Sequence, residues 1–507
     1  MAHQQPPLSA SLSRRGFLLA GSGAAAALAL AACTKDSGTA LIEPDSTEVR
    51  DAEQARRAAN ATVRNVSLRS TPATVDLGGV RVDTWTYGSG LPGPEIRVRK
   101  GEVLRAELTN ALPEPTTVHW HGIALRNDMD GVPDLTQPAV AAGSTFGYEF
   151  TVPDSGTYFY HSHVGVQLDR GLYGPLIVED PDDGSDYDVE AVVVLDDWLD
   201  GTDGRTPDRQ LQQLREQGMD DMDMGGMGHG GMAMSADPNQ PLGADGGDVT
   251  YPHFLINGRL GSDPVSFTAR PGQRMRLRII NAAADTAFRV AVGGHRLRIT
   301  HSDGFPVQPV TGASVLVGMG ERYDAVIELG DGVFPLVASA ESKDGQALAV
   351  IRTGAGAPPA ANVRPAELDS PPLTEEQFTA AESARLPQRA PDRTLEVALG
   401  SDDQKYLWTI NGRAYPDHAP LEIAAGERIR LRFTNRTMMY HPMHVHGHTY
   451  QVVTPTGTGP RKDTSIVLPM HTVEADFDAN NPGQWMLHCH NIYHAESGMM
   501  SVVSYTR

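Results

Sequence analysis

One ten-residue pattern occurs three times along the chain, and it restricts the fold more than any other feature. The copies are GEVLRAELTN from Gly101, GQRMRLRIIN from Gly272 and GERIRLRFTN from Gly426. Each copy begins with a glycine turn, alternates apolar with charged residues, and ends in asparagine. Alternation with a period of two is typical of a strand that is buried on one face only. The repeat therefore predicts three related β domains.

Flanking segments support this division, because LINGRL at Leu255 and TINGRAY at Thr409 precede the second and third copies. Short strands separated by Gly and Pro are typical of Greek-key β-sandwiches. We therefore expect an all-β protein with domains at 61–182, 188–355 and 392–507. A Pro-rich linker is expected at 356–391. Within it, TEEQFTAAESARL from Thr374 predicts one short helix, since a Thr and two acids suit a helix N-terminus.

The first 33 residues resemble a targeting segment. Arg14 and Arg15 precede a short apolar run that ends in small residues, a pattern typical of twin-arginine export signals. A membrane-spanning helix needs about 20 apolar residues, and an uncleaved anchor is the alternative interpretation. The sequence LAAC, ending at Cys33, resembles a bacterial lipobox. We therefore expect lipidation of Cys33, a polar tether over 34–60, and a location on the outer face of the cytoplasmic membrane.

Charge and cysteine content restrict the partners. The net charge of -21 argues against nucleic acid as a partner, because phosphates would be repelled. The chain has two cysteines, but Cys33 is explained by the lipobox and Cys489 lies in a histidine cluster, so we expect no disulfide.

Ten of the 18 histidines lie in four short clusters, and every cluster contains the pattern His-x-His. The pairs are His119/His121, His161/His163, His444/His446 and His488/His490. Residues two apart on a strand face the same side. A single pair is more often a packed or surface pair than a metal site, but four pairs that converge supply eight imidazoles. One tetrahedral zinc takes four ligands, so eight imidazoles favour several ions, and copper suits imidazole.

Cys489 lies between two of these histidines, and on an extended segment its thiol faces away from them. Cys489 with His441, His494 and a weak axial Met499 is the ligand set of a blue-copper electron-transfer site. The sequence thus predicts an electron-entry copper that is joined through a few covalent bonds to a histidine-rich cluster.

Taken together, these motifs resemble those of the multicopper oxidases over essentially all of the mature chain. The resemblance implies three cupredoxin-like domains, four copper ions, and one-electron oxidation of a substrate coupled to reduction of O2 to water. It implies type 1 ligands His441, Cys489, His494 and Met499, type 2 ligands His119 and His444, and type 3 ligands His121, His161, His163, His446, His488 and His490. HWHGIALRNDMDG and HCHNIYHAESGMM are most similar to the exported bacterial copper-resistance, cuprous-oxidase branch.

Acidic residues near the predicted ligands, which are candidates for proton transfer or for orienting an imidazole, are open to two interpretations. Asp130 stands where the family carries an acid that assists proton delivery, and the alternative is a solvated loop carboxylate. Many relatives have Glu directly after the type 1 histidine, whereas this chain has Ala495 followed by Glu496, which leaves the second proton-relay acid in doubt. Asp463 is a candidate to orient a type 1 histidine, because ligating imidazoles need an acceptor behind them; strand-end capping is the alternative.

Candidate Cu(I)-binding residues are concentrated in a low-complexity segment, GMDDMDMGGMGHGGMAM, at 218–234. Soft thioethers select Cu(I), and a passive insertion is the alternative. The candidates are Met219, Met222, Met224, Met227, His229, Met232 and Met234. Met439 matches a cuprous docking position of the resembled branch, although Thr437 replaces an acid there, and core packing is the alternative for Met439.

These observations predict a cell-envelope copper enzyme that oxidises Cu(I) and reduces O2 to water, in copper detoxification. Laccase-like oxidation of phenols or aromatic amines and oxidation of ferrous or manganous ions are the enzymatic alternatives. A copper-sequestering protein is the non-enzymatic one, and His490 argues against a nitrite reductase, whose pattern lacks this histidine. We expect a monomer whose partners are O2 and small reductants, with membrane contact through the lipid only.

Overall fold

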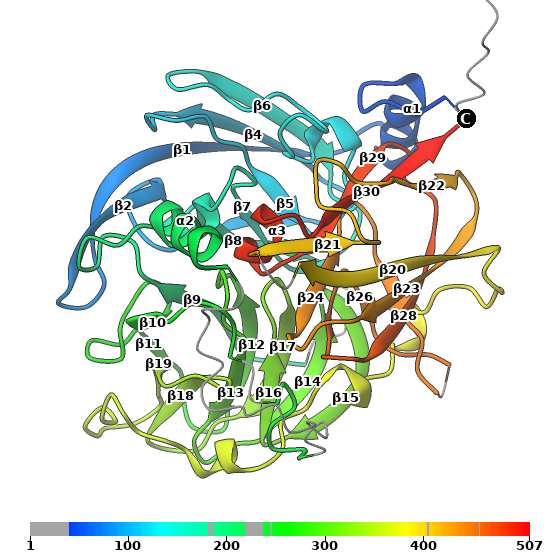
Figure 1. Ribbon diagram of the computed structural model, residues 1–507. Coiled ribbons are helices and arrows are strands. Elements are labelled where there is room, and N and C mark those ends of the chain that lie inside the picture. Colours follow the sequence, from blue (N-terminus) through cyan, green and yellow to red (C-terminus); the bar gives the residue numbers. More distant parts are fainter. Residues whose placement is uncertain (1–39, 181–185, 219–236, 244–245, 403–404, 456) are drawn as a thin grey trace, which may run out of the picture. The chain divides into compact units, whose positions relative to one another are not determined.

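A computed structural model describes residues 40–180, 186–218, 237–243, 246–402, 405–455 and 457–507. Residues Leu41 to Arg507 form one compact unit, whose described part consists mainly of strands (Figure 1). Its α-helices are α1 (Thr47–Arg56), α2 (Pro207–Gln217) and α3 (Ile492–Glu496). In this part of the chain, no helix has the length and apolar character needed to cross a membrane.

Strands β1 to β8 form the first domain, in two sheets with the orders β2-β1-β4-β6 and β3-β8-β7-β5. The bounds are β1 Val63–Asp76, β2 Arg81–Tyr87, β3 Ile96–Arg99, β4 Val103–Asn110, β5 His119–His121, β6 Thr145–Thr151, β7 Gly156–His161 and β8 Tyr173–Glu179. Two 3-10 turns, η1 (Asn127–Met129) and η2 (Gln167–Arg170), lie in its loops.

Strands β9 to β19 form the middle domain, in sheets with the orders β10-β9-β12-β17-β14-β15 and β11-β19-β18-β13-β16. The bounds are β9 Val189–Trp198, β10 His253–Ile256, β11 Ser266–Thr268, β12 Arg274–Asn281, β13 Phe288–Val292, β14 Leu297–Ser302, β15 Phe305–Gly312, β16 Ser314–Val317, β17 Arg322–Glu328, β18 Val333–Ala340 and β19 Gln346–Arg352.

Strands β20 to β30 form the last domain, in sheets with the orders β21-β20-β23-β28-β25-β26 and β22-β30-β29-β24-β27. The bounds are β20 Arg393–Asp402, β21 Leu407–Ile410, β22 Leu421–Ala424, β23 Arg428–Asn435, β24 His441–Val445, β25 Tyr450–Val452, β26 Arg461–Lys462, β27 Thr464–Val467, β28 Thr472–Asp478, β29 Gln484–Cys489 and β30 Met500–Thr506.

The repeated sequence pattern occupies the same place in each domain, as strands β4, β12 and β23. Each of these strands pairs in parallel with the first strand of its domain and antiparallel with the strand on its other side. Leu108, Ile279 and Phe433 on these strands belong to one continuous hydrophobic core. The alternation in the sequence corresponds to strands exposed on one face in β4 and β23. Strand β12 is instead buried on both faces, and its Arg276 and Arg278 pair with Asp324 and Glu190.

The asparagine that ends each copy has the same structural role. The side-chain oxygens of Asn110, Asn281 and Asn435 accept hydrogen bonds from the backbone amides two residues later, each over 2.9 Å. The side-chain amides donate to backbone carbonyls of the loop that follows the strand. Because buried polar groups need partners, this residue fixes where the chain leaves the strand.

The linker forms 3-10 turns where the sequence predicts a helix. The turns are η3 (Ala366–Asp369), η4 (Glu375–Gln377) and η5 (Glu382–Ala384), and Thr374 does form the expected capping box. Beyond Gln377 the backbone bonds elsewhere, because Ala380 and Ala381 donate to carbonyls of Gly459 and Pro306. Tertiary hydrogen bonds therefore replace the i to i−4 bonds that would extend the helix, and that prediction was wrong.

The segment expected to be a tether is folded from Leu41 onward. Helix α1 begins after Ser46, whose side chain accepts from Val49 N. Its Glu53 accepts hydrogen bonds from the backbone and hydroxyl of Thr151, and Arg56 donates to Ala124 O. The helix is therefore attached to the first domain rather than extended in solvent.

Candidate metal centre

A cysteine and two histidines meet in the last domain as predicted. Cys489 Sγ lies 3.7 Å from His441 Nδ1 and 3.6 Å from His494 Nδ1, and the two nitrogens are 3.1 Å apart. All three residues are buried, and Cys489 is a free thiol. This arrangement offers one sulfur and two nitrogens to a single ion.

Local structure brings these three residues together. His441 begins β24, and Cys489 ends the neighbouring strand β29, where it pairs with Met443. Asn491 then caps α3 by accepting from the amide of His494, which turns the chain back toward the thiol. Met499 is fully buried, and its backbone bonds both Cys489 and His494, so the predicted axial residue lies beside the triad.

The outer nitrogens of the two triad histidines have different partners. His441 Nε2 lies 2.8 Å from Thr437 Oγ1, and His494 Nε2 lies 2.7 Å from Asp248 Oδ2. Although burial opposes it, the Asp248 carboxylate raises the pKa of His494 to about 10. Asp248 belongs to the middle domain and was not found in the sequence, because no motif surrounds it.

The eight histidines of the four His-x-His pairs converge in a buried cluster between the first and last domains. Strand pairing places His119 opposite His161 and His444 opposite His488. Two groups of three rings result, with centroids 4.9–5.7 Å apart in one and 5.0–5.2 Å apart in the other. The groups are His121, His161 and His490, and His163, His446 and His488. The remaining pair, His119 and His444, has a centroid separation of 5.9 Å.

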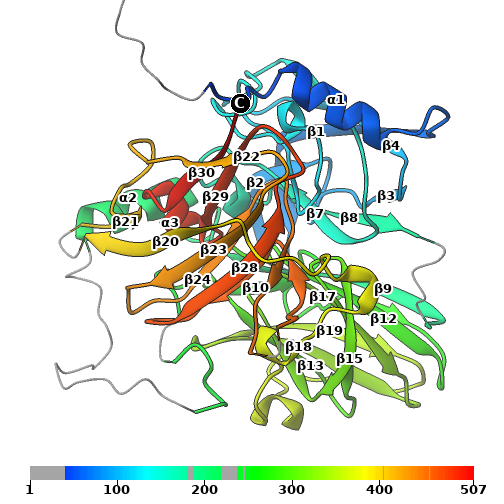
Figure 2. The ribbon, with the colours of Figure 1, turned by 90° about the vertical axis from the view of Figure 1, so that its right-hand side faces the viewer.

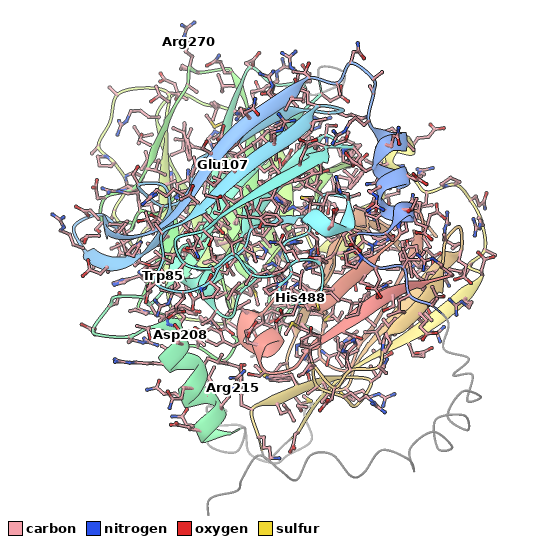
Figure 3. All side chains as sticks on the ribbon, turned by 90° about the horizontal axis from the view of Figure 1, so that it is seen from above. Trp85, Glu107, Asp208, Arg215, Arg270 and His488 are labelled. Carbon is pink, nitrogen blue, oxygen red and sulfur yellow. The ribbon has the colours of Figure 1, made fainter. Side chains whose placement is uncertain are left out.

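The cysteine therefore separates two groups of candidate ligands. His488 lies in the interior of the described unit (Figure 3), and its Nε2 is 3.0 Å from His446 Nε2, on the cluster side. The thiol of Cys489 instead faces His441 and His494. The expectation that the thiol and its neighbours face different groups agrees with this geometry.

Hydrogen bonding leaves free nitrogens that metal ions can use. His119, His161 and His488 donate from Nδ1 to the carbonyl oxygens of Asp130, Ser162 and Cys489. Unpartnered buried nitrogens remain on His119, His121, His161, His163, His444 and His490. Buried polar atoms without partners are costly, and a set of converging imidazole nitrogens is a donor set that copper accepts. The residues present therefore fit copper.

Burial favours the neutral form of seven cluster imidazoles. Loss of solvent, with a further contribution from neighbouring imidazoles, lowers their pKa values below the ordinary value of 6.5. The affected residues are His121, His161, His163, His444, His446, His488 and His490. A neutral imidazole has the lone pair that a metal ion needs, so the cluster is prepared for binding.

Two buried carboxylates stand behind the cluster. Asp130 Oδ2 lies 2.8 Å from His446 Nδ1, and Asp130 Oδ1 lies 3.2 Å from His119 Nδ1. Asp130 is therefore not a solvated loop residue. Asp463 Oδ1 lies 3.2 Å from His121 Nε2. The expectation that Asp463 orients a type 1 histidine was wrong, because the Asp463 side chain lies on the cluster side of the last domain.

The predicted docking residue Met439 differs in burial from its neighbour Met438. Met439 is 9% exposed and belongs to the hydrophobic core, whereas Met438 is 46% exposed. The exposed thioether in this stretch therefore belongs to Met438, next to Thr437. The methionines and His229 predicted at 219–234, and also Cys33, lie outside the described residues.

Three family models, each described as multicopper oxidase, match the chain at 70–183, 190–356 and 388–507. The multicopper oxidase MmcO of Mycobacterium tuberculosis is 48% identical over 498 residues, which cover 97% of this chain and 96% of that protein. The chain is a multicopper oxidase. Copper ions are therefore its cofactors, and O2 is the electron acceptor of this family.

More distant relatives of this multicopper oxidase include a copper resistance protein A of Escherichia coli. It is 26% identical, and the alignment covers 85% of this chain and 90% of the relative. Among solved structures, Fet3p, a multicopper oxidase that functions in iron import, superposes with a TM-score of 0.74 at 21% identity, over 87% of this chain and 90% of Fet3p. The cupredoxin-like fold predicted from the sequence is confirmed.

Proposed function

We propose that this multicopper oxidase binds four copper ions and oxidises Cu(I). His441, Cys489, His494 and Met499 would hold the type 1 copper, and His119 and His444 the type 2 copper. His121, His161 and His490 would hold one type 3 ion, and His163, His446 and His488 the other. Bound copper supplies electron transfer. Four Cu(I) ions, O2 and four protons give four Cu(II) ions and two water molecules.

The observation that carries the Cu(I) proposal is the contact between His494 and Asp248. Asp248 follows the Met-rich range, residues 218–234, in the chain. Its side chain is 1% exposed and contacts His494 Nε2. On the other side of that range, Arg215 of α2 donates to Glu496 O at the end of α3 (Figures 2 and 3). Described residues both before and after the Met-rich range therefore contact the last domain next to His494.

The chemistry around the triad suits a soft cation. Met438 exposes a thioether three residues before His441, and thioethers select Cu(I) over harder ions. The Asp248 carboxylate adds negative charge beside the outer nitrogen of His494. An electron leaving Cu(I) at this surface would pass through an imidazole that Asp248 already orients. These features support Cu(I) as the reductant.

Phenol oxidation is a second candidate, and a relative favours it. A laccase of Fomitopsis schrenkii is among the relatives, at 27% identity.

Oxygen uptake by the fully copper-loaded chain would test both candidates. Stabilised Cu(I) and a simple phenol would be compared in the intact chain, in Asp248→Asn, and in a chain lacking 218–234. Faster uptake with Cu(I) that is lost on deletion supports the cuprous oxidase. Faster oxygen uptake with the phenol supports a laccase-like oxidase if the deletion leaves that uptake unchanged and Asp248→Asn lowers it. Fe(II) would be assayed alongside.

We further propose that the protein is exported by the twin-arginine route and acts in copper detoxification as a lipid-anchored monomer of the cell envelope. The arginine pair and the sequence LAAC support this location. Mass spectrometry of Cys33 in protein from cells would test it, because lipidation adds a defined mass and an unmodified N-terminal thiol would contradict it.

A further inference from the structure

Arg322 is a fully buried residue of the middle domain, which supplies none of the proposed copper ligands. Its Nε donates to Thr157 O of the first domain over 3.1 Å. Its Nη1 and Nη2 donate to Asp463 Oδ1 and Oδ2 of the last domain over 2.7 and 2.6 Å. A bidentate guanidinium fixes the plane and rotation of a carboxylate as well as its charge. One side chain thus connects three domains and orients Asp463.

Asp463 in turn contacts two proposed ligands, one through its side chain and one through its backbone. Its Oδ1 lies 3.2 Å from His121 Nε2, and its backbone carbonyl lies 2.9 Å from His444 Nδ1. Because these oxygens accept, the proton resides on Nε2 of His121 and on Nδ1 of His444. The free nitrogens are Nδ1 of His121 and Nε2 of His444, and both are buried without a partner.

His121 is oriented opposite to its neighbours. The cluster histidines that bond outward through Nδ1 are His119, His161, His444, His446 and His488. His121 bonds outward through Nε2 and therefore needs an acceptor in a different position. Asp463, held by Arg322, occupies that position.

The packing around this pair has no spare space. Gly122 follows His121 with a φ of +83°, and a Cβ there would lie 2.4 Å from Arg322 Nη2 and 2.6 Å from Asp463 Oδ2. A Cβ on Gly320, at the turn before Arg322, would lie 2.8 Å from His490 Cδ2. The turn between β16 and β17 is therefore pressed against the histidine cluster.

We propose that Arg322 is a positioning residue for the histidine cluster. Acting through the Asp463 carboxylate, it holds the tautomer and ring orientation of His121, so that the middle domain controls copper affinity in a cluster to which it contributes no ligand. The proposal rests on the proposed assignment of these histidines to copper, and it is independent of the reducing substrate. Hydrogen-bond partners behind metal ligands affect metal affinity about 10–100-fold in other proteins.

Arg322→Lys tests this proposal, since lysine keeps the positive charge but cannot make the bidentate hydrogen bonds to the Asp463 carboxylate. In the metal-free protein labelled with 15N-histidine, NMR would read the tautomer of His121; in the copper-loaded protein, chelator competition would read cluster affinity. We expect a mixed tautomer and about 10–100-fold weaker binding in the cluster, with the blue type 1 band retained. Arg276→Lys is the matched control, because Arg276 and Asp324 form a buried pair in the same domain.

Two results would overturn the proposal. One is an unchanged His121 tautomer with wild-type cluster affinity in Arg322→Lys. The other is loss of the blue band together with the cluster copper, which would show that Arg322 only maintains the fold. If wild-type protein takes up no copper in the histidine cluster, the proposed function fails instead, while the tautomer measurement still tests Arg322.

A double-mutant cycle adds a second criterion. Arg322→Gln and Asp463→Asn would be combined, and cluster copper affinity measured in all four proteins. If Arg322 acts through Asp463, the double variant binds cluster copper about as weakly as the single variant with the lower copper affinity. Additive losses would mean that the two residues act independently, which would contradict the proposal.

Discussion

Asp130 and His446 lie 316 positions apart in the chain, yet Asp130 Oδ2 accepts a hydrogen bond from His446 Nδ1 over 2.8 Å. The contact joins the first domain to the last. The backbone carbonyl of Asp130 accepts from His119 Nδ1 over 2.8 Å, so one residue holds an imidazole from each domain. A carboxylate in this position can transfer protons at the cluster as well as orient its ligands.

Asp130→Asn is expected to retain the four proposed copper ions and to slow O2 reduction about 10–100-fold, because the amide keeps the shape but cannot carry a proton as a carboxyl does. Copper content and the reoxidation rate of the reduced protein would be measured. Asp128→Asn on the same loop is the control, since Asp128 pairs with Arg126 instead of a histidine. Unchanged reoxidation in Asp130→Asn would remove the proposed role.

Gly122→Ala is expected to lose copper from the histidine cluster while it keeps the type 1 copper, because the added methyl would collide with Arg322 and Asp463. Gly101→Ala is the matched control: its φ is +80° and its Cβ would meet nothing within 4 Å. Backbone strain of about 1–2 kcal/mol is then common to both variants. Equal copper content and equal loss of stability in both would contradict the predicted collision.

Met499→Leu is expected to retain the blue band and to raise the type 1 reduction potential, because a weak thioether ligand would be replaced by a hydrocarbon. The exchange nearly conserves volume, so unfolding should be easier by less than about 1.5 kcal/mol. A redox titration would measure the potential. Met500→Leu is the control beside it in the chain, and equal potentials in both variants would argue against Met499 as a ligand.

Met438→Leu is expected to raise the KM for Cu(I) with little change in the KM for a phenol, because Met438 exposes its thioether near His441. Met439→Leu is expected to affect stability more than Cu(I) kinetics, since Met439 packs in the core. Oxygen uptake at varied Cu(I) concentration would measure both. A larger KM change in the Met439 variant would support the docking position predicted from the sequence.

Glu375→Gln is expected to alter the pH dependence of stability. Burial, opposed by the nearby Lys462 ammonium, raises the pKa of Glu375 from 4.5 to about 7. The folded state therefore binds the Glu375 proton more tightly than the unfolded state does. The resulting contribution to the free energy of unfolding is complete below pH 4.5 and is lost as pH rises through 7. At pH 8 the variant should be about 1–3 kcal/mol more stable than wild type.

Urea unfolding at pH 4.5 and pH 8 would measure this difference. Glu376→Gln is the control, because Glu376 is exposed and adjacent. A stability difference between Glu375→Gln and wild type that is the same at both pH values would contradict the raised pKa.

Features that depend on local spacing were visible in the sequence. Alternation in β4 and β23 reflects a strand buried on one face. The asparagines that end all three repeated strands reflect a turn that each copy must make alone. His-x-His pairs are visible for the same reason, because two residues apart on a strand share a face. The cysteine between two histidines also implied two separate groups of ligands from backbone geometry alone.

Contacts between domains were decided only by the tertiary structure. Asp463 was predicted beside the triad and lies beside the cluster, because the pairing of β24 with β27 places Thr464 opposite His444 and Val467 opposite His441. Asp248 and Arg322 have no motif, since a single side chain that reaches a site from another domain leaves no period in the sequence. The helix predicted within the linker, and the tether predicted over the segment from Leu41 to Arg56, were also wrong, because the hydrogen-bond partners of these segments lie in distant strands and loops. The chain's sequence thus determined the ligand types and their strands, and domain packing decided which groups hold those ligands in place.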